Sequence, residues 1–313
     1  MTMRYMSALT AAFLLASAAV TDPALAGGPV TPGAVVDADW LAEHRGEVAV
    51  LDVRRDLESF AGGHIPKAAP VGWDAVRTTR TIDGVERQKV RLAAETFQRL
   101  MREAGVDANE PVVITSPGKA AGQITTQARL YWQFAYYGHD DVAILDGGNA
   151  AWRAAGHDLA TGPAEVSAGD YTAGAPDDSV LATVAEVDAA RTNAGVQLTD
   201  NRPMAYYLGL EQAGYVYAAG HIPSAVNVPF TLNVAEKGPA TLRDAESLRA
   251  VYAYQGAPMD LAAIAYCNSG HVSALTWFVM SEVLGNDDAQ LFDGSMHVWT
   301  QDESRPVTNP ARR

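Results

Sequence analysis

The amino-acid sequence predicts an α/β protein made of two tandem domains, each with a mostly parallel sheet flanked by helices. Apolar runs of four to six residues alternate with helix-like stretches along the chain, a pattern typical of largely parallel sheets. Four sequence landmarks also occur twice, in the same order. A length of 313 residues is sufficient for two separate cores, which agrees with both observations.

The landmarks are short strand-like and turn-like segments. The first copies are residues 48–54 (VAVLDVR), 63–68 (GHIPKA), 111–116 (PVVITS) and 144–152 (ILDGGNAAW). The second copies are residues 196–202 (VQLTDNR), 220–225 (GHIPSA), 262–267 (AAIAYC) and 291–299 (LFDGSMHVW). Their recurrence at a spacing of about 150 residues indicates an internal duplication.

The duplication sets the expected domain boundaries. We assign residues 27–159 to an N-terminal domain and residues 179–313 to a C-terminal domain. Residues 160–178 lie between the two copies and are rich in Gly, Pro, Ala and Asp, so we expect an exposed linker there.

Residues 1–26 have the features of a cleavable secretory signal. A charged start with Arg4 precedes an apolar run over residues 8–20, and small residues end the segment, with the cut predicted after Ala26. The apolar run is shorter than the about 20 residues needed to span a bilayer. We therefore expect a periplasmic or secreted monomer that is free of the membrane after cleavage, with a retained N-terminal anchor as the alternative.

Charge and cysteine content narrow the classes of function. The formal net charge of −14 argues against nucleic acid as a partner, since no basic stripe offsets it. The only cysteine, Cys267, cannot form an internal disulfide, so it is either an inert buried residue or a working thiol. The seven histidines show no metal-ligand spacing, so neither a metal nor another cofactor is expected.

Cys267 occupies the most informative segment of the chain. It lies between an apolar strand and a helix, where successive N–H groups from residues 268–273 are expected to surround one point. That arrangement and the helix N-terminus stabilise a thiolate or a persulfide. Gly270 is expected to permit the tight turn, and Ser273 is the expected N-cap of the helix.

Comparison of the two copies distinguishes a residue expected to react from residues expected to be structural. The first copy has Ser116 where the second has Cys267, so thiol chemistry is confined to the second domain. His64 and His221 belong to Gly-His-Ile-Pro turns, for which a structural role is the simplest interpretation.

Two repeated acidic residues also have a simple structural interpretation. Asp146 and Asp293 each precede a glycine after an apolar strand. We expect them to form turns rather than to act as acids or metal ligands.

The Cys-loop-helix segment, the paired Asp-x-Arg strand ends, the paired Gly-His-Ile-Pro turns and the Asp-Gly-x-x-x-x-Trp elements together resemble tandem rhodanese sulfurtransferases. The resemblance covers nearly all of the mature chain. It implies a catalytically silent N-terminal domain and a C-terminal domain that takes sulfane sulfur from thiosulfate or 3-mercaptopyruvate. Cyanide or a thiol then attacks the Cys267 persulfide.

The same resemblance implies the roles of individual residues. Cys267 is the nucleophile and sulfur carrier. Arg202 is a substrate-binding residue, with a structural ion pair within its domain as the alternative, and Asp200 and His221 support the site. The remaining expected substrate-binding residues form the loop that follows the cysteine, and they are Asn268, Ser269, Gly270, His271, Val272 and Ser273.

The chain departs from the family pattern at cationic positions. Asn268 replaces a usual Arg, Val272 replaces a usual hydroxyl residue, and Tyr206 lies near the position of a second Arg in some members. His271 is the expected compensation, as a cation near pH 6.5 or as a neutral hydrogen-bond donor.

The resemblance also implies that the substrate lies where the two domains meet, with the first domain contributing a wall rather than chemistry. Trp73, Arg77 and Arg80 follow the first Gly-His-Ile-Pro turn and are candidates to reach that cleft.

Two other functions fit parts of this pattern. A cysteine-dependent phosphatase would need a longer loop ending in Arg, and residues 267–275 contain none. A non-catalytic persulfide carrier or sulfur-binding module serving a protein partner is favoured by the missing second Arg. Turnover of free thiosulfate or 3-mercaptopyruvate would distinguish the enzyme from the carrier.

Overall fold

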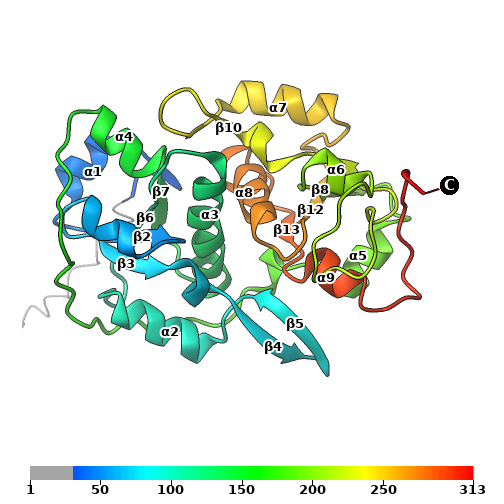
Figure 1. The fold of residues 1–313 in the computed structure, drawn as a ribbon, viewed down its shortest axis with the longest axis horizontal. Coiled ribbons are helices and arrows are strands. Elements are labelled where there is room, and N and C mark those ends of the chain that lie inside the picture. The colour runs from blue at the N-terminus through cyan, green and yellow to red at the C-terminus, as the bar shows by residue number, and fades with distance from the viewer. Residues whose placement is uncertain (1–30, 313) are drawn as a thin grey trace, which may run out of the picture.

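The computed structural model describes residues 31–312, and the predicted secretory signal lies outside them. The chain forms two α/β halves that lie side by side (Figure 1). The helices of this described part are all too short or too polar to cross a membrane.

The first half contains a five-stranded sheet in the order β1-β7-β6-β2-β3, in which every neighbouring pair is parallel. Its strands are β1 (Val35–Val36), β2 (Ala49–Arg54), β3 (Ala69–Gly72), β6 (Val112–Thr115) and β7 (Val142–Leu145). Its helices are α1 (Ala38–His44), α2 (Ala94–Glu103), α3 (Ala121–Tyr136) and α4 (Gly148–Ala154). An antiparallel hairpin of β4 (Thr78–Ile82) and β5 (Val85–Val90) projects toward the second half (Figure 1).

The second half contains a four-stranded parallel sheet in the order β13-β12-β8-β9. Its strands are β8 (Val196–Asp200), β9 (Val226–Asn227), β12 (Ala262–Tyr266) and β13 (Ala289–Leu291). Its helices are α5 (Val184–Ala190), α6 (Met204–Tyr207), α7 (Ala245–Tyr254), α8 (Val272–Phe278) and α9 (Ser295–Trp299), and a short ladder joins β10 (Val234–Ala235) to β11 (Thr241–Leu242). The predicted fold class, two domains with mostly parallel sheets flanked by helices, is confirmed.

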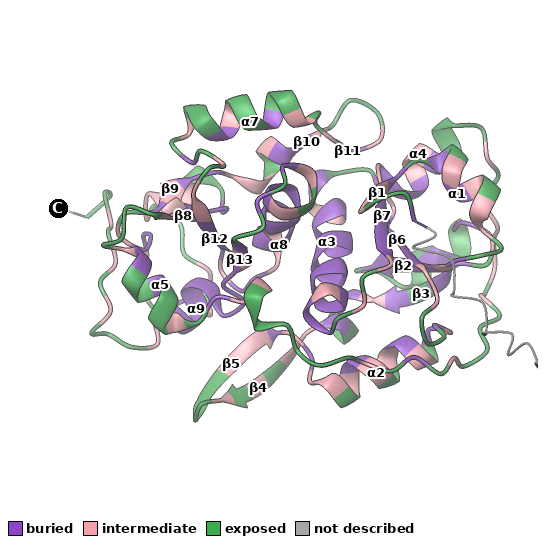
Figure 2. Ribbon diagram, turned by 180° about the vertical axis from the view of Figure 1, so that it is seen from behind, coloured by how far each residue is buried: buried purple, intermediate pink, exposed green. Residues whose placement is uncertain are grey.

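The burial of the central strands explains why apolar runs in the sequence predicted them. All residues of β6 and β7 are buried, and so are four of the five residues of β12. Strands that helices cover on both faces are expected to be continuous apolar runs rather than alternating ones. Figure 2 shows the buried residues, in purple, in the middle of each half.

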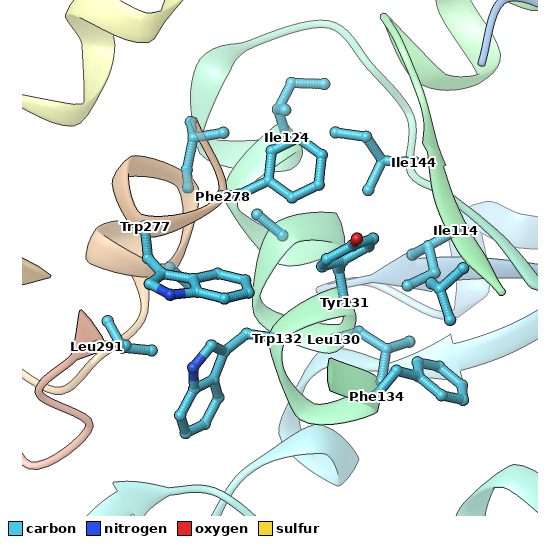
Figure 3. Packing of buried hydrophobic residues seen from close by; sticks show 14 of the residues in the cluster. Ile114, Ile124, Leu130, Tyr131, Trp132, Phe134, Ile144, Trp277, Phe278 and Leu291 are labelled. Atoms are coloured by element: carbon cyan, nitrogen blue, oxygen red, sulfur yellow. The ribbon is translucent and has the colours of Figure 1, made fainter. Parts of the chain in front are cut away.

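Helix α3 joins the two halves into one packed unit. It lies against α8, and the ring centroids of Tyr131 and Phe278 are 4.8 Å apart in an edge-on arrangement. Trp132, Trp277 and Leu291 belong to the same buried cluster, which spans both halves (Figure 3). Because this cluster is shared, the first half contributes directly to the support of the second half's cysteine loop.

The segment between the halves runs along the first one. Most of residues 160–178 are exposed, as expected for a linker, but Tyr171 in its middle is buried against Phe97. The N–H of Gly169 donates to the carbonyl of Arg102 (2.9 Å), and that of Tyr171 donates to the carbonyl of Val106 (3.1 Å). The connection is therefore attached to the first half at several points.

Candidate active site

Cys267 follows directly after β12, at the carboxyl edge of the second sheet. Strands β12 and β8 are paired so that Tyr266 lies opposite Asp200. Arg202 therefore leaves the sheet at the same edge as Cys267. The cysteine side chain is buried apart from a small face that lines a cavity of about 350 Å³.

This Cys267 cavity lies between the two halves of the molecule. Its lining residues come from both halves and are Arg55, Arg77, Lys89, Arg202, Pro203, Tyr206, Tyr215, Phe230, Cys267, Asn268, Ser269, His271 and Val272. Within residues 31–312, the lining includes no Asp or Glu. The expected location of the substrate at the domain junction therefore coincides with a real and strongly cationic cavity.

The predicted site residues divide into two groups. Cys267, Asn268, Ser269, His271, Val272 and Arg202 line the cavity, whereas Gly270, Ser273, Asp200 and His221 do not. Tyr206 also lines it, so the position where some family members have a second Arg faces the cavity without a charge.

The loop after Cys267 differs from the expected cradle at the N–H of Gly270. The hydroxyl oxygen of Ser295 accepts hydrogen bonds from the N–H of Cys267 (3.0 Å) and of Gly270 (2.9 Å). It donates in turn to the carbonyl of Phe292 (2.8 Å). Ser295 therefore occupies these two amides and holds the loop in place.

Sequence reasoning missed Ser295, although the duplication contained a signal for it. Ser295 has φ +48°, and its counterpart Gly148 in the first copy has φ +55°. A left-handed backbone is costly for a residue with a Cβ, so a serine at a position suited to glycine calls for an explanation. Holding the cysteine loop provides that explanation.

Two smaller expectations about this loop had different outcomes. Gly270 has φ +69°, and a Cβ there would lie 2.6 Å from the carbonyl oxygen of Asp293, so the predicted need for glycine is confirmed. The prediction that Ser273 is the N-cap is wrong. His271 occupies the cap position of α8, and the buried Ser273 hydroxyl, inside the first turn, has no partner among the described residues.

His271 is packed into the domain junction. Its Nε2 lies 2.8 Å from the Thr125 hydroxyl of α3, and its ring centroid is 4.1 Å from that of Trp73. Burial, followed by repulsion from Arg55 and Arg77, holds the pKa of His271 well below its ordinary value of 6.5. The imidazole is therefore neutral near pH 7, which argues against the cationic alternative and leaves the neutral hydrogen bond, the other expectation for this residue.

This neutral state makes stability depend on pH. Below about pH 6.5 the unfolded chain binds a proton at His271 that the folded chain does not, so folding is progressively disfavoured as the pH falls. We expect a loss of up to about 1.4 kcal/mol per pH unit from this residue. Urea denaturation at pH 7 and pH 5 should show a smaller decrease for His271→Gln than for the unaltered protein, and equal decreases would contradict the assignment.

Arg202 is primarily a structural residue. Its Nε and Nη2 donate to the two carboxylate oxygens of Asp200 (2.9 and 2.5 Å), and Nη2 also donates to the carbonyl of Gly220 (2.6 Å). Burial opposes its charge, but the Asp200 carboxylate outweighs that and raises the pKa of Arg202. Its remaining Nη1 donates to Oδ1 of Asn268 (3.3 Å), so Arg202 orients the loop while much of its charge is neutralised.

The two turn histidines make structural contacts. Nδ1 of His221 lies 2.7 Å from the carbonyl oxygen of Tyr207, and the two rings are stacked at 3.8 Å. His64 makes the equivalent pair of contacts with Phe60, at 3.0 and 3.8 Å. Neither ring reaches the Cys267 cavity.

The two acidic residues lie in turns, as expected, and they also contact the opposite half. The Asp293 carboxylate accepts from Nη2 of Arg129 (2.5 Å) and from the N–H of Arg91 (3.0 Å). Asp146 accepts from the N–H of Leu242 (2.8 Å). Local sequence could not reveal these roles because the partners lie about 100 to 200 residues away in the chain.

The candidate residues of the first half have a mixed outcome. Arg77 lines the cavity, as expected, whereas Trp73 is buried against His271 and does not line it. Arg80 does not line it, because its Nη1 donates to the carbonyl of Leu92 (3.0 Å). Arg55 and Lys89 were missed, and nothing in their local sequence distinguishes them from surface cations.

The first half retains the architecture of the site without a thiol. Arg54 pairs with Asp52 (2.7 Å) and donates to the carbonyl of Gly63 (2.7 Å), as Arg202 does in the second half. Ser116 takes the cysteine position and is fully buried beside Gln127.

Across residues 31–312, no group of three or more His, Cys, Asp or Glu side chains is placed to hold a metal ion.

Comparison with known proteins assigns this architecture to a family. The family model described as "Rhodanese-like domain" matches residues 37–155 and 183–302. The chain belongs to the rhodanese-like family. It contains two such domains, and the second one carries the cysteine loop.

Relatives of this tandem rhodanese-like protein extend over nearly its whole length. The Saccharopolyspora erythraea protein named "Putative thiosulfate sulfurtransferase" is 33% identical over 288 residues, which cover 88% of this chain and 96% of the relative. A Mycobacterium tuberculosis protein of the same name is 34% identical over 277 residues, covering 85% and 93%. These similarities identify the chain as a sulfurtransferase enzyme.

Solved structures agree with this assignment. SseA from Escherichia coli, described as a 3-mercaptopyruvate sulfotransferase, matches with a TM-score of 0.71 and 27% identity, covering 84% of this chain and 98% of SseA. The wild-type structure of EanB matches with a TM-score of 0.76 at 20% identity, covering 88% and 69%, which shows a common fold alone.

Proposed function

We propose that this enzyme moves a sulfane sulfur from thiosulfate or 3-mercaptopyruvate to a thiol or cyanide through a persulfide on Cys267. One observation carries the proposal. The only thiol of the chain lines a cavity with four cationic side chains, and the described lining contributes no carboxylate. A small anionic donor is attracted into such a cavity and meets a nucleophile there.

The reaction balances without an external oxidant. The Cys267 thiolate attacks the outer sulfur of thiosulfate, the S–S bond of the donor breaks, and sulfite leaves with the electron pair. A thiolate acceptor then attacks the outer sulfur of the Cys267 persulfide, takes it as a new persulfide and regenerates the Cys267 thiolate. Loop N–H groups not bound to Ser295 stabilise the charged sulfur during both steps.

The cavity favours thiosulfate over 3-mercaptopyruvate. Thiosulfate carries two negative charges in a compact group, whereas the carboxylate donor carries one. Coulomb attraction to several cations in a partly dehydrated cavity increases with the charge of the ligand. The names of the relatives from Saccharopolyspora and Mycobacterium point to the same donor.

Intact mass spectrometry tests this function directly. The folded, reduced protein is measured before and after thiosulfate, separately after 3-mercaptopyruvate, and again after cyanide. We expect a gain of one sulfur atom that cyanide removes, and steady-state kinetics of the double-displacement type. If neither donor adds sulfur, the catalytic proposal fails and a persulfide carrier loaded by a protein partner replaces it.

A further inference from the structure

The second domain alone has little free positive charge at its own cysteine. Arg202 is bound to Asp200 and to the carbonyl of Gly220. His271 is neutral, for the reasons given above, and Tyr206 is uncharged. An anionic donor therefore needs cations from elsewhere.

The first domain supplies three such cations, which we name the first-domain cation cluster: Arg55, Arg77 and Lys89. All three line the Cys267 cavity. Arg55 follows β2, Arg77 precedes β4, and Lys89 lies in β5, the hairpin strand that extends toward the second half (Figure 1). Three separate elements of one domain therefore converge on the thiol of the other.

Aromatic rings hold the cluster in place. The guanidinium carbons of Arg77 and Arg55 lie 4.5 and 5.3 Å from the ring centroid of Trp73, which itself packs on His271. The Lys89 ammonium lies 3.8 Å from the ring centroid of Tyr215. Such contacts fix the direction of a cation without neutralising it.

The charges of the cluster are largely uncompensated. Arg77 has one ion pair, with Asp74 at 2.8 Å, and that carboxylate is 90% exposed, so the pair is weak. Among the described residues, no carboxylate forms an ion pair with Arg55 or Lys89. Burial and the proximity of Arg77 lower the pKa of both groups, and the attraction of the exposed Asp74 carboxylate offsets this only in part.

We propose that the first-domain cation cluster is the site that binds the oxoanion end of the sulfur donor, while the second domain supplies the thiol. The bound donor thus bridges the two domains. The cluster replaces cations that the cysteine loop of this chain lacks, and it selects compact dianions over monocarboxylates. This inference deepens the proposed function and rests on it for the identity of the donor.

The test measures anion binding separately from sulfur transfer. Iodoacetamide alkylates Cys267 in the absence and presence of sulfate, an unreactive dianion, and acetate serves as the monoanion control. We expect sulfate to protect the thiol at concentrations where acetate does not. Arg55→Gln and Lys89→Gln should each weaken the protection about tenfold, the size of one lost charge-assisted hydrogen bond.

Arg87→Gln is the matched control. Arg87 lies two residues before Lys89 in β5, pairs with Asp83 at 2.9 Å and does not line the Cys267 cavity. In the Arg87→Gln variant, sulfate should protect Cys267 as fully as in the unaltered protein. The Lys89→Arg variant should keep most of the sulfate protection that Lys89→Gln loses. Unchanged protection in both cluster variants, or equal weakening in Arg87→Gln, would overturn the proposal.

The outcome separates this inference from the proposed function. If sulfate protection depends on the cluster but thiosulfate adds no sulfur to Cys267, the anion site stands and the donor assignment fails. If thiosulfate loads Cys267 with the same KM in all variants, sulfur transfer stands and the cluster is not its anion site.

Discussion

Cys267→Ser is expected to lower sulfur transfer by more than about a thousandfold while the protein remains folded. A serine hydroxyl cannot accept sulfane sulfur as a persulfide, and its size fits the space of the buried thiol. The loop should stay in place, because Ser295 holds it through backbone N–H groups that the substitution does not change. Thiosulfate:cyanide sulfur transfer and circular dichroism provide the two measurements.

Ser116→Ala is the matched control in the first domain. Ser116 occupies the position equivalent to Cys267, is fully buried, and lies within 2.8 Å of the Gln127 side-chain amide. Its replacement should cost about 1 kcal/mol of unfolding free energy and leave turnover within about twofold. Comparable losses of activity in Ser116→Ala and Cys267→Ser would contradict the assignment of a single active domain.

Arg129→Met is expected to reduce the unfolding free energy by about 3 to 5 kcal/mol and to lower turnover as well. Arg129 is almost completely buried in α3, and its Nη2 donates to the Asp293 carboxylate of the other half at 2.5 Å. Its Nη1 donates to the carbonyl of Gly270 in the cysteine loop at 3.1 Å. Removing the guanidinium leaves a buried carboxylate without its strongest partner and releases the loop.

Urea denaturation and thiosulfate kinetics measure these two effects. Arg99→Met in α2 is the control, because Arg99 and its partner Glu103 are about two thirds exposed and 3.8 Å apart. Such a surface pair is worth less than about 0.5 kcal/mol. Arg129→Lys should not restore activity, since one ammonium cannot reproduce the two-armed contact with Gly270 and Asp293. Equal stability of the two Met variants would rule out the proposed interdomain role of Arg129.

Much of the architecture could be predicted from sequence because its signals are local. A buried parallel strand is a continuous apolar run, and the turns before β3 and β9 and after β7 and β13 carry their own landmarks. The duplication made these signals stronger by showing each one twice. The same comparison singled out Cys267, since its counterpart in the first copy is Ser116.

The supporting residues could not be found in this way. Ser295, Asp293 and Arg129 contact the cysteine loop, but each has a local sequence that suggests an ordinary turn or helix residue. From its place in the loop, His271 could be either a cation or a neutral hydrogen-bond donor. Thr125 and Trp73 of the other domain pack against its ring, and cations of that domain lie beside it, which favours the neutral form.

By itself the sequence determined that this chain has two mostly parallel α/β domains, and it singled out Cys267 as the only cysteine and the candidate nucleophile. Only the tertiary structure decided which charges surround that cysteine. Arg55, Arg77 and Lys89 are separated from Cys267 by about 180 to 210 residues, and they meet it because α3 and α8 pack together and bring the first domain over the loop. Periodicity and turn chemistry act over a few residues, whereas the electrostatics of a cavity depend on every residue that packing brings within several ångströms.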